Sequence, residues 1–359
     1  MKGRVNISSA ISVVAYGLRR FNLTTIVHHI AQRVELKGSN MRAMVLPRFG
    51  GSDLFEMHEL ERPEPECGEV LVRVIASAVN PVDAKLRADG RWAKLDPPVI
   101  LGYDVAGVVE EVGPGSGDFR IGDAVYYTPE IFGNPHGSYA EYNVASAAIV
   151  ARKPADLSFV EASAIPLAGG TAWEAIIRRL AVRPGETILI HGGAGGVGSF
   201  AIQFARAAGA RVIASASAEN QDLLRQLGAD VTIDYRKDDA AEITLRETYG
   251  YGADAAFDIE GVDIVARCLP AVRPFGRIAC ILPPQGDLSA LYQKNITLHG
   301  IFLIRERRRL DEMRPLFERK QAHPVIDTVL PLQEVGKAHD RLDSHHGKGK
   351  IVLQVGSDR

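Results

Sequence analysis

The sequence predicts an α/β protein that combines a β-rich module with a doubly wound parallel sheet. Two observations support this prediction. Residues 41–154 consist mostly of short apolar or alternating runs separated by turns rich in glycine and proline, which is typical of strands. From residue 158 onward, strand-like runs alternate with segments of helical spacing, and this alternation favours a parallel sheet with helices on both faces.

Length and composition limit the function classes. With 359 residues, 46% of them hydrophobic and 24% charged, the chain resembles an ordinary globular protein of about two domains. The net charge of −2 gives no reason to expect a nucleic-acid partner, and no apolar run reaches the roughly 18 residues that span a bilayer. Widely spaced cysteines exclude a disulfide framework and favour a reducing compartment: Cys67, Cys268 and Cys280.

Residues 1–40 form an extension rich in basic residues, with Glu35 as the one acid. This composition occurs in organellar transit peptides. A disordered extension, or a start codon placed too early, also explains it, because Met41 opens a convincing domain by itself. We favour this second explanation and a cytoplasmic protein, with an organellar location as the alternative.

In the β-rich module, strands are expected at residues 41–46, 69–79, 105–113 and 123–129. Residues 159–182 have helical spacing, which Pro166 and Gly169–Gly170 are expected to interrupt.

The second part is expected to hold six strands, at residues 186–192, 211–217, 231–235, 255–261, 276–282 and 296–304. Helices are expected between the first strands of this set, at residues 200–209, 219–228 and 238–250. A charged helix follows at residues 305–321, and its basic run, Arg305 to Arg309, is expected to be a solvated helix face. Residues 350–355 are expected to form a last strand.

The stretch at residues 187–200, TILIHGGAGGVGSF, predicts a strand, a glycine turn and a helix start. Gly192 allows a tight turn, Gly195 lets the backbone approach a pyrophosphate, and Gly198 lets the helix pack on the strand. Free N–H groups and the helix dipole then favour an anion. The residues predicted to bind a dinucleotide here are Gly192, Gly193, Ala194, Gly195, Gly196, Val197 and Gly198.

Several motifs together resemble the medium-chain dehydrogenases/reductases, specifically the quinone oxidoreductase (zeta-crystallin-like) branch. The resemblance runs from Met41 to Val355. It rests on the motifs NPVDAKLR at 80–87, LGYDVAGVVEEVG at 101–113, PLAGGTAWEAI at 166–176, HGGAGGVG at 191–198 and GKGKIVLQV at 347–355.

The resemblance implies a GroES-like β-rich catalytic domain at residues 41–165 and 304–359, and a Rossmann NADP-binding domain at 166–303. It also places the active site in the cleft between them.

Zinc-dependent alcohol dehydrogenases share this architecture, and in them a cysteine lies near the position of Asn80 and a Gly-His-Glu sequence near Gly102. A catalytic zinc needs three protein ligands. Here Tyr103 stands in place of the histidine, the segment has no cysteine, and Asp104 alone does not make a zinc site. We therefore expect no metal.

The choice of nucleotide depends on the end of the second strand, where NAD-specific sites carry an acid. Here that strand ends in Ser215 and Ser217, and serine can donate a hydrogen bond to a 2′-phosphate. Tyr235 and Arg236 resemble the family's tyrosine–arginine pair near the adenosine phosphate, although Arg236 could equally start a solvated helix. The sequence favours NADPH.

Candidate catalytic residues are Asn80, Trp92 and Tyr103. Asn80 either lies beside the substrate or holds the turn before Pro81. Trp92 falls where related enoyl reductases carry a proton-donating tyrosine, and an indole cannot act as a general acid near neutral pH. It is expected to form a flat wall for a planar substrate, or to pack in its loop. Tyr103 could donate the proton only if it faces the cleft, and otherwise water would donate it.

The resemblance also implies cofactor contacts from Thr171, Phe302 and Lys350. The leading hypothesis is an NADPH-dependent, zinc-independent reductase of quinones or α,β-unsaturated carbonyls. The alternatives are an NADPH-binding structural or regulatory protein with little turnover and a zinc alcohol dehydrogenase. An apolar strand near Ile296–Ile304 is expected at the sheet edge, where it would pair two copies into a homodimer.

Overall fold

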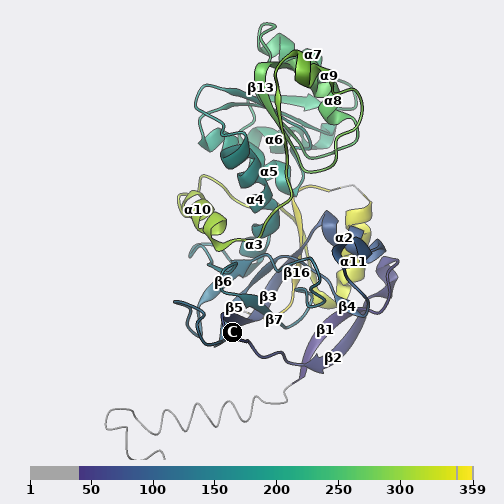
Figure 1. The fold of residues 1–359 in the computed structure, drawn as a ribbon, viewed down its shortest axis with the longest axis vertical. Helices are drawn as coiled ribbons and strands as arrows, with labels where there is room; N and C mark the ends of the chain where they lie inside the picture. The colour runs from purple at the N-terminus through teal and green to yellow at the C-terminus, as the bar shows by residue number, and fades with distance from the viewer. Residues whose placement is uncertain (1–39, 345–346, 358–359) are drawn as a thin grey trace, which may run out of the picture.

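The structure is a computed structural model that describes residues 40–344 and 347–357. The predictions for the extension concern residues 1–39, which lie outside the described residues. In Figure 1, a parallel sheet and its helices form the upper part of the molecule, and a β-rich part lies below them. No helix within the described ranges has the length and apolar content needed to cross a bilayer.

The upper part is a six-stranded parallel sheet in the order β11-β10-β9-β12-β13-β14. This arrangement confirms the predicted doubly wound sheet, and the strand order reverses beside β9, where ligands bind in such folds. Its strands are β9 (Thr187–Ile190), β10 (Arg211–Ala216), β11 (Val231–Asp234), β12 (Ala253–Asp258), β13 (Val272–Cys280) and β14 (Thr297–Gly300). The helices connecting these strands are α5 (Gly196–Ala207), α6 (Gln221–Leu227), α7 (Ala240–Glu247), α8 (Ile264–Cys268) and α9 (Ser289–Gln293).

The lower part contains a three-stranded sheet and a seven-stranded sheet. The first has the order β2 (Glu56–Glu61), β1 (Asn40–Leu46) and β4 (Val99–Ile100). The second has the order β15 (Ile326–Pro331), β16 (Lys350–Gln354), β3 (Glu69–Val79), β5 (Val105–Val112), β6 (Ala124–Tyr127) and β8 (Ala151–Arg152), with β7 (Tyr142–Ser146) also paired to β3. Because β16 pairs antiparallel with β3, the C-terminal segment returns to the first part of the chain, as expected.

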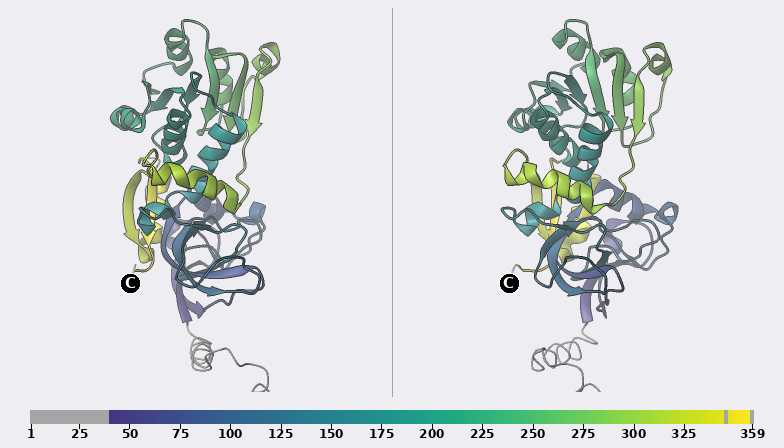
Figure 2. Two further views of the ribbon diagram at one scale, coloured as in Figure 1. Left: turned by 90° about the vertical axis from the view of Figure 1, so that its left-hand side faces the viewer. Right: turned by 60° about the vertical axis from the view of Figure 1, so that its left-hand side comes forward.

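The remaining helices lie in or beside the lower part: α2 (Pro81–Ala88), α3 (Phe159–Ser163), α4 (Pro166–Trp173), the π-helical turn η4 (Glu174–Arg179), α10 (Arg307–Glu318) and α11 (Val335–Asp343). In Figure 2, α10 crosses the molecule between the parallel sheet and the β-rich part. One apolar core extends through both parts and includes Val72 of β3, Phe200 of α5 and Phe317 of α10. The domain bounds expected from the sequence remain a proposal.

The expected interruption at Gly169–Gly170 is wrong, since α4 runs through both glycines and the break lies between α3 and α4. The glycines are needed for close packing. A Cβ atom at Gly169 would lie 3.1 Å from the side chain of Ile165, and one at Gly170 would lie 3.3 Å from that of Leu303.

The expected strand at residues 296–304 is also too long, because β14 ends at Gly300. In the next four residues, buried Ile301 and Leu303 alternate with exposed Phe302 and Ile304. That alternation resembles a strand, but the pairing with β13 ends with the hydrogen bond from the Ile301 N–H to the carbonyl of Cys280 at 2.8 Å. The four residues lead instead toward α10 (Figure 1).

Candidate active site

The glycine loop between β9 and α5 has the geometry that the sequence predicts. Gly192 has φ +72°, a conformation that favours glycine. A Cβ atom at Gly198 would lie 2.1 Å from the carbonyl oxygen of Gly192, so only glycine permits this packing of helix on strand. A Cβ atom at Gly195 would meet only one atom within 4 Å, at 3.6 Å, so space is open beside the helix start. The carboxylate of Glu260 lies against Gly192.

The C-terminal strand begins directly against this loop. The backbone N–H of Gly349 donates to the carbonyl of Ala194 at 2.8 Å. The next side chain, Lys350, lies over Gly196, where an added Cβ would be 2.8 Å from Lys350 Cδ. The contact places a cation from the end of the chain beside the predicted dinucleotide loop.

Lys350 joins a buried polar cluster with Asn80 and Asp104. Its Nζ donates to Asn80 Oδ1, to Asp104 Oδ2 at 3.2 Å and to the carbonyl of Val79 at 3.0 Å. Asn80 Nδ2 donates to the same Asp104 oxygen at 2.8 Å. Burial raises the pKa of Asp104, and the Lys350 ammonium opposes that rise. Asn80 therefore makes hydrogen bonds within the cluster through both the oxygen and the nitrogen of its side-chain amide.

Asp83 continues this cluster toward α11. Its Oδ2 accepts from the backbone N–H of Asn80 and from the Tyr139 hydroxyl, both at 2.9 Å, and His339 Nε2 lies 3.2 Å from that hydroxyl. The first contact caps the start of α2. Burial raises the pKa of Asp83 to about 7 and lowers that of His339 to about 3.

Tyr103 is fully buried, and its hydroxyl has no hydrogen-bond partner among the described residues. Burial raises the pKa of Tyr103, with the Asp83 carboxylate adding to the rise and Arg305 opposing it. A phenol with a raised pKa is a weaker proton donor, which weakens the case for Tyr103 as general acid.

Trp92 belongs to an aromatic surface assembled from three segments. Its ring meets Phe132 edge-on at 6.0 Å between centroids, and Phe132 meets Phe302 at 5.6 Å. The three residues are 47%, 49% and 56% exposed, respectively. We call Trp92, Phe132 and Phe302 the aromatic surface. Its partial exposure leaves flat apolar area free for a planar ligand.

The residues expected near the adenosine end are only partly brought together. Ser215 is buried within β10, with its Oγ 3.4 Å from His191 Nδ1. Ser217 lies at the strand end, as expected. The guanidinium of Arg236 lies 5.7 Å from the ring centroid of Tyr235 and 3.9 Å from the carboxylate of Glu219. Glu219 lies two residues beyond Ser217 in the sequence.

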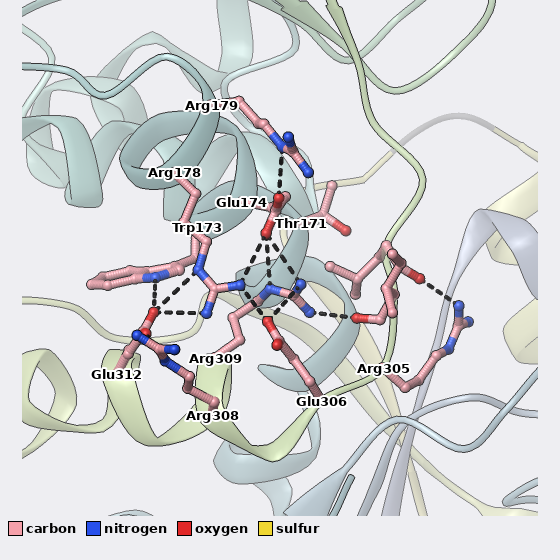
Figure 3. A network of polar contacts seen from close by, with 12 residues as sticks. Thr171, Trp173, Glu174, Arg178, Arg179, Arg305, Glu306, Arg308, Arg309 and Glu312 are labelled. Carbon is pink, nitrogen blue, oxygen red and sulfur yellow. Dashed lines mark hydrogen bonds and ion pairs between the residues drawn. The ribbon is translucent and has the colours of Figure 1, made fainter. Parts of the chain in front are cut away.

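Thr171, Arg308 and Arg309 lie around the junction of α4, η4 and α10 (Figure 3). Thr171 Oγ1 donates to the carbonyl of Leu167 at 2.7 Å. Expecting the whole basic run to be solvated was wrong, because Arg309 is 5% exposed and pairs with Glu174 at 3.1 Å and Glu306 at 3.0 Å. Buried guanidinium groups require such partners, and the sequence pattern does not show them.

The donor set does not fit a metal ion. Within the described ranges, no three His, Cys, Asp or Glu side chains gather closely enough to hold one. At the position compared with zinc enzymes, the Asp104 carboxylate accepts hydrogen bonds from Lys350, Asn80 and the backbone N–H of Leu167. An ammonium group therefore already balances the charge of this carboxylate.

Sequence reasoning missed two features of this site. Phe132 completes the aromatic surface from the loop between β6 and β7. Arg305 lies beside Phe302, with its Cζ 6.0 Å from the ring centroid. Its place directly after an alternating apolar run, at residues 301–304, was the signal available in the sequence.

Comparison with known proteins identifies the family. Residues 66–155 match the alcohol dehydrogenase GroES-like domain, and residues 196–319 match the family described as zinc-binding dehydrogenase. The chain is 32% identical to a chloroplastic NADPH-dependent alkenal/one oxidoreductase of Arabidopsis thaliana, over 98% of this chain and 89% of that protein.

Solved structures agree with this assignment. The quinone oxidoreductase from Coxiella burnetii is 30% identical, with a TM-score of 0.79 over 88% of this chain and 100% of that one. A structure described as an NAD-dependent alcohol dehydrogenase is 35% identical, with a TM-score of 0.82 over 88% and 100%. The chain is therefore an oxidoreductase of the medium-chain dehydrogenase/reductase superfamily and belongs to its quinone oxidoreductase-like branch.

Proposed function

We propose that the protein is an NADPH-dependent, zinc-independent reductase of quinones or α,β-unsaturated carbonyl compounds. The observation that carries the proposal is the buried Lys350–Asn80–Asp104 cluster beside the glycine loop. The cluster lies beside the predicted dinucleotide loop, and in it the ammonium of Lys350, and not a metal ion, balances the carboxylate of Asp104. Although one matched family is described as zinc-binding, the donor set here does not fit zinc.

The residues fit a nicotinamide dinucleotide. The loop from Gly192 to Gly198 leaves open space beside Gly195 at the start of a 12-residue helix, which suits a pyrophosphate. Thr171, Phe302 and Lys350 stand around the nicotinamide end in this proposal. When bound, the reduced cofactor supplies a hydride, which with one proton converts an alkene to an alkane or a quinone to a hydroquinone.

The chain's own part in this chemistry is positioning and electrostatics. The aromatic surface holds a planar acceptor. Lys350 holds Asn80 and Asp104 in place by donating hydrogen bonds to both side chains. Since Tyr103 has a raised pKa and no indole serves as an acid, we propose that water supplies the proton.

NADPH is proposed over NADH because serines, with no acid, end β10, and because Arg236 lies at the adenosine end. The name of the Arabidopsis relative supports this choice. The name of the NAD-dependent structural neighbour and the carboxylate of Glu219 beside Arg236 oppose it. A side-by-side assay of the two cofactors therefore decides the point.

The test measures NADPH and NADH oxidation by the full chain with 1,4-naphthoquinone, 9,10-phenanthrenequinone and a 2-alkenal. We expect turnover of at least one acceptor, with higher kcat/KM for NADPH. Tight NADPH binding without turnover of any acceptor would refute the proposal and favour a structural or regulatory NADPH-binding protein.

We also propose a homodimer through the sheet edge, now restricted to β14, because this strand pairs on one side with β13 alone. A monomer in sedimentation at micromolar concentration would contradict it. A cytoplasmic location remains our proposal, with an organelle as the alternative, since the Arabidopsis relative is described as chloroplastic. Imaging of the full chain fused to a fluorescent protein distinguishes the two.

A further inference from the structure

Among the described residues, no carboxylate lies within ion-pair distance of Arg305, unlike the other arginines of the basic run. The ion pairs of its neighbours join Arg307 to Asp118 and Asp311, Arg308 to Glu312, and Arg309 to Glu174 and Glu306. The guanidinium of Arg305 donates instead to the backbone carbonyls of Pro129 at 3.3 Å and Leu303 at 2.6 Å. Neither bond neutralises its charge.

The Arg305 side chain is half-buried, and part of its guanidinium is withdrawn from water. Its Nη2 is buried and has no hydrogen-bond partner within the part of the chain that the structure describes. Burial lowers the pKa of Arg305, against the opposing effects of Glu130 and Tyr103. The carboxylate of Asp104 also acts on it, but Lys350 already balances that charge at 3.2 Å. Because buried charges in proteins are normally paired, this one indicates an anion that the chain does not supply.

The surroundings of Arg305 indicate what the anion is attached to. Phe302, whose ring centroid is 6.0 Å from the guanidinium carbon, is the end of the aromatic surface nearest to it. A planar conjugated molecule lying on Phe302 and Phe132 would reach Arg305 with its polar end. The flat fork of a guanidinium matches a carboxylate in two parallel hydrogen bonds.

We propose that Arg305 is a specificity-determining residue that selects acceptors carrying a carboxylate next to their conjugated system. This inference rests on the proposed reductase function, and it narrows the acceptor class within it. Arg305 binds the acceptor's carboxylate, and the aromatic surface binds its conjugated part.

The experiment compares two acceptors that share one enone, 3-benzoylacrylate and its methyl ester, with NADPH and the full chain. We expect kcat/KM to be higher for the acid, although the ester is the stronger electrophile. Equal turnover, or faster turnover of the ester, would overturn the inference and leave the proposed function standing. Turnover of neither compound, nor of the quinones, would overturn the proposed function itself.

Two variants locate the effect. In Arg305→Met we expect KM for the acid to rise so that kcat/KM falls roughly tenfold to a hundredfold, the range for a charged hydrogen bond, with the ester unchanged. Arg305→Lys keeps the charge and should retain part of the preference. The control is Arg308→Met, since Arg308 belongs to the same basic run, lies exposed in the first turn of α10 and pairs only with Glu312 in the described structure.

Other results would overturn the assignment. A higher KM for NADPH in Arg305→Met would make Arg305 a cofactor ligand. An equal fall of kcat with both acceptors would mean that it stabilises charge developing during the reaction. NADPH binding by each variant serves as the check of folding, and the wild-type comparison of acid with ester tests the inference without any variant.

Discussion

Replacing Lys350 with methionine tests whether its ammonium holds the centre of the site together. The side chain is 4% exposed and donates to three acceptors, one of them on the fully buried Asp104. Methionine fills the volume of the methylene stem, so the main effect is a carboxylate left buried without a counter-charge. Removing one partner of a buried ion pair costs about 3–5 kcal/mol.

The double variant Lys350→Met, Asp104→Asn isolates this interaction. It removes both charges, so we expect it to recover a coupling energy of about 2 kcal/mol or more relative to the sum of the single variants. The assay is denaturant unfolding of wild type, both single variants and the double variant at pH 7. Additive effects would refute the claim that these groups interact across the site.

The pH dependence of Lys350→Met provides a second readout. Without the ammonium, burial raises the folded-state pKa of Asp104 further above its unfolded value. The associated stability is then present at low pH and is lost as the pH rises. The variant should therefore be less destabilised at pH 5 than at pH 8, and a pH-independent difference would contradict the reasoning.

Three further predictions concern single positions. Burial raises the folded-state pKa of Asp83 to about 7, so this group stabilises the fold fully below pH ~4 and loses that contribution as the pH rises to ~7. In denaturant unfolding, the stability of Asp83→Asn relative to wild type should therefore increase by up to roughly 4 kcal/mol between pH 4 and pH 8. A difference that does not change with pH would contradict this prediction. Gly195→Ala should raise KM for NADPH with little loss of stability because only open space surrounds its Cβ, whereas Gly198→Ala should lower the melting temperature because its Cβ meets backbone at 2.1 Å; the same outcome for both variants would contradict the assigned roles. Ser217→Asp should shift the kcat/KM ratio toward NADH, because a carboxylate there repels a 2′-phosphate, and an unchanged ratio would remove this strand end from cofactor selection.

The glycine loop could be predicted because its signal is local. A strand, a turn that needs positive φ and a helix start follow one another within 14 residues, and each has its own residue preferences. The order of the parallel strands follows from the same alternation, together with the handedness of crossover connections.

The polar cluster could be predicted only in part. Asn80 and Lys350 were expected near the cofactor from a resemblance, but their contact with each other joins residues 270 positions apart, and no periodicity records it. The role of Arg305 was hidden for a related reason. A run of arginines resembles a solvated face until the structure shows which carboxylates lie opposite each one. Within the described ranges, no carboxylate forms an ion pair with Arg305.

In the proposed function, hydride transfer takes place beside the Lys350–Asn80–Asp104 cluster and needs no metal ion. The most direct measurement is the rate of NADPH oxidation with an accepted quinone or enone before and after dialysis against a chelator, with the metal content of both samples determined by mass spectrometry. The account predicts an unchanged rate and no stoichiometric zinc. A rate that is lost on dialysis and restored by added zinc would contradict it.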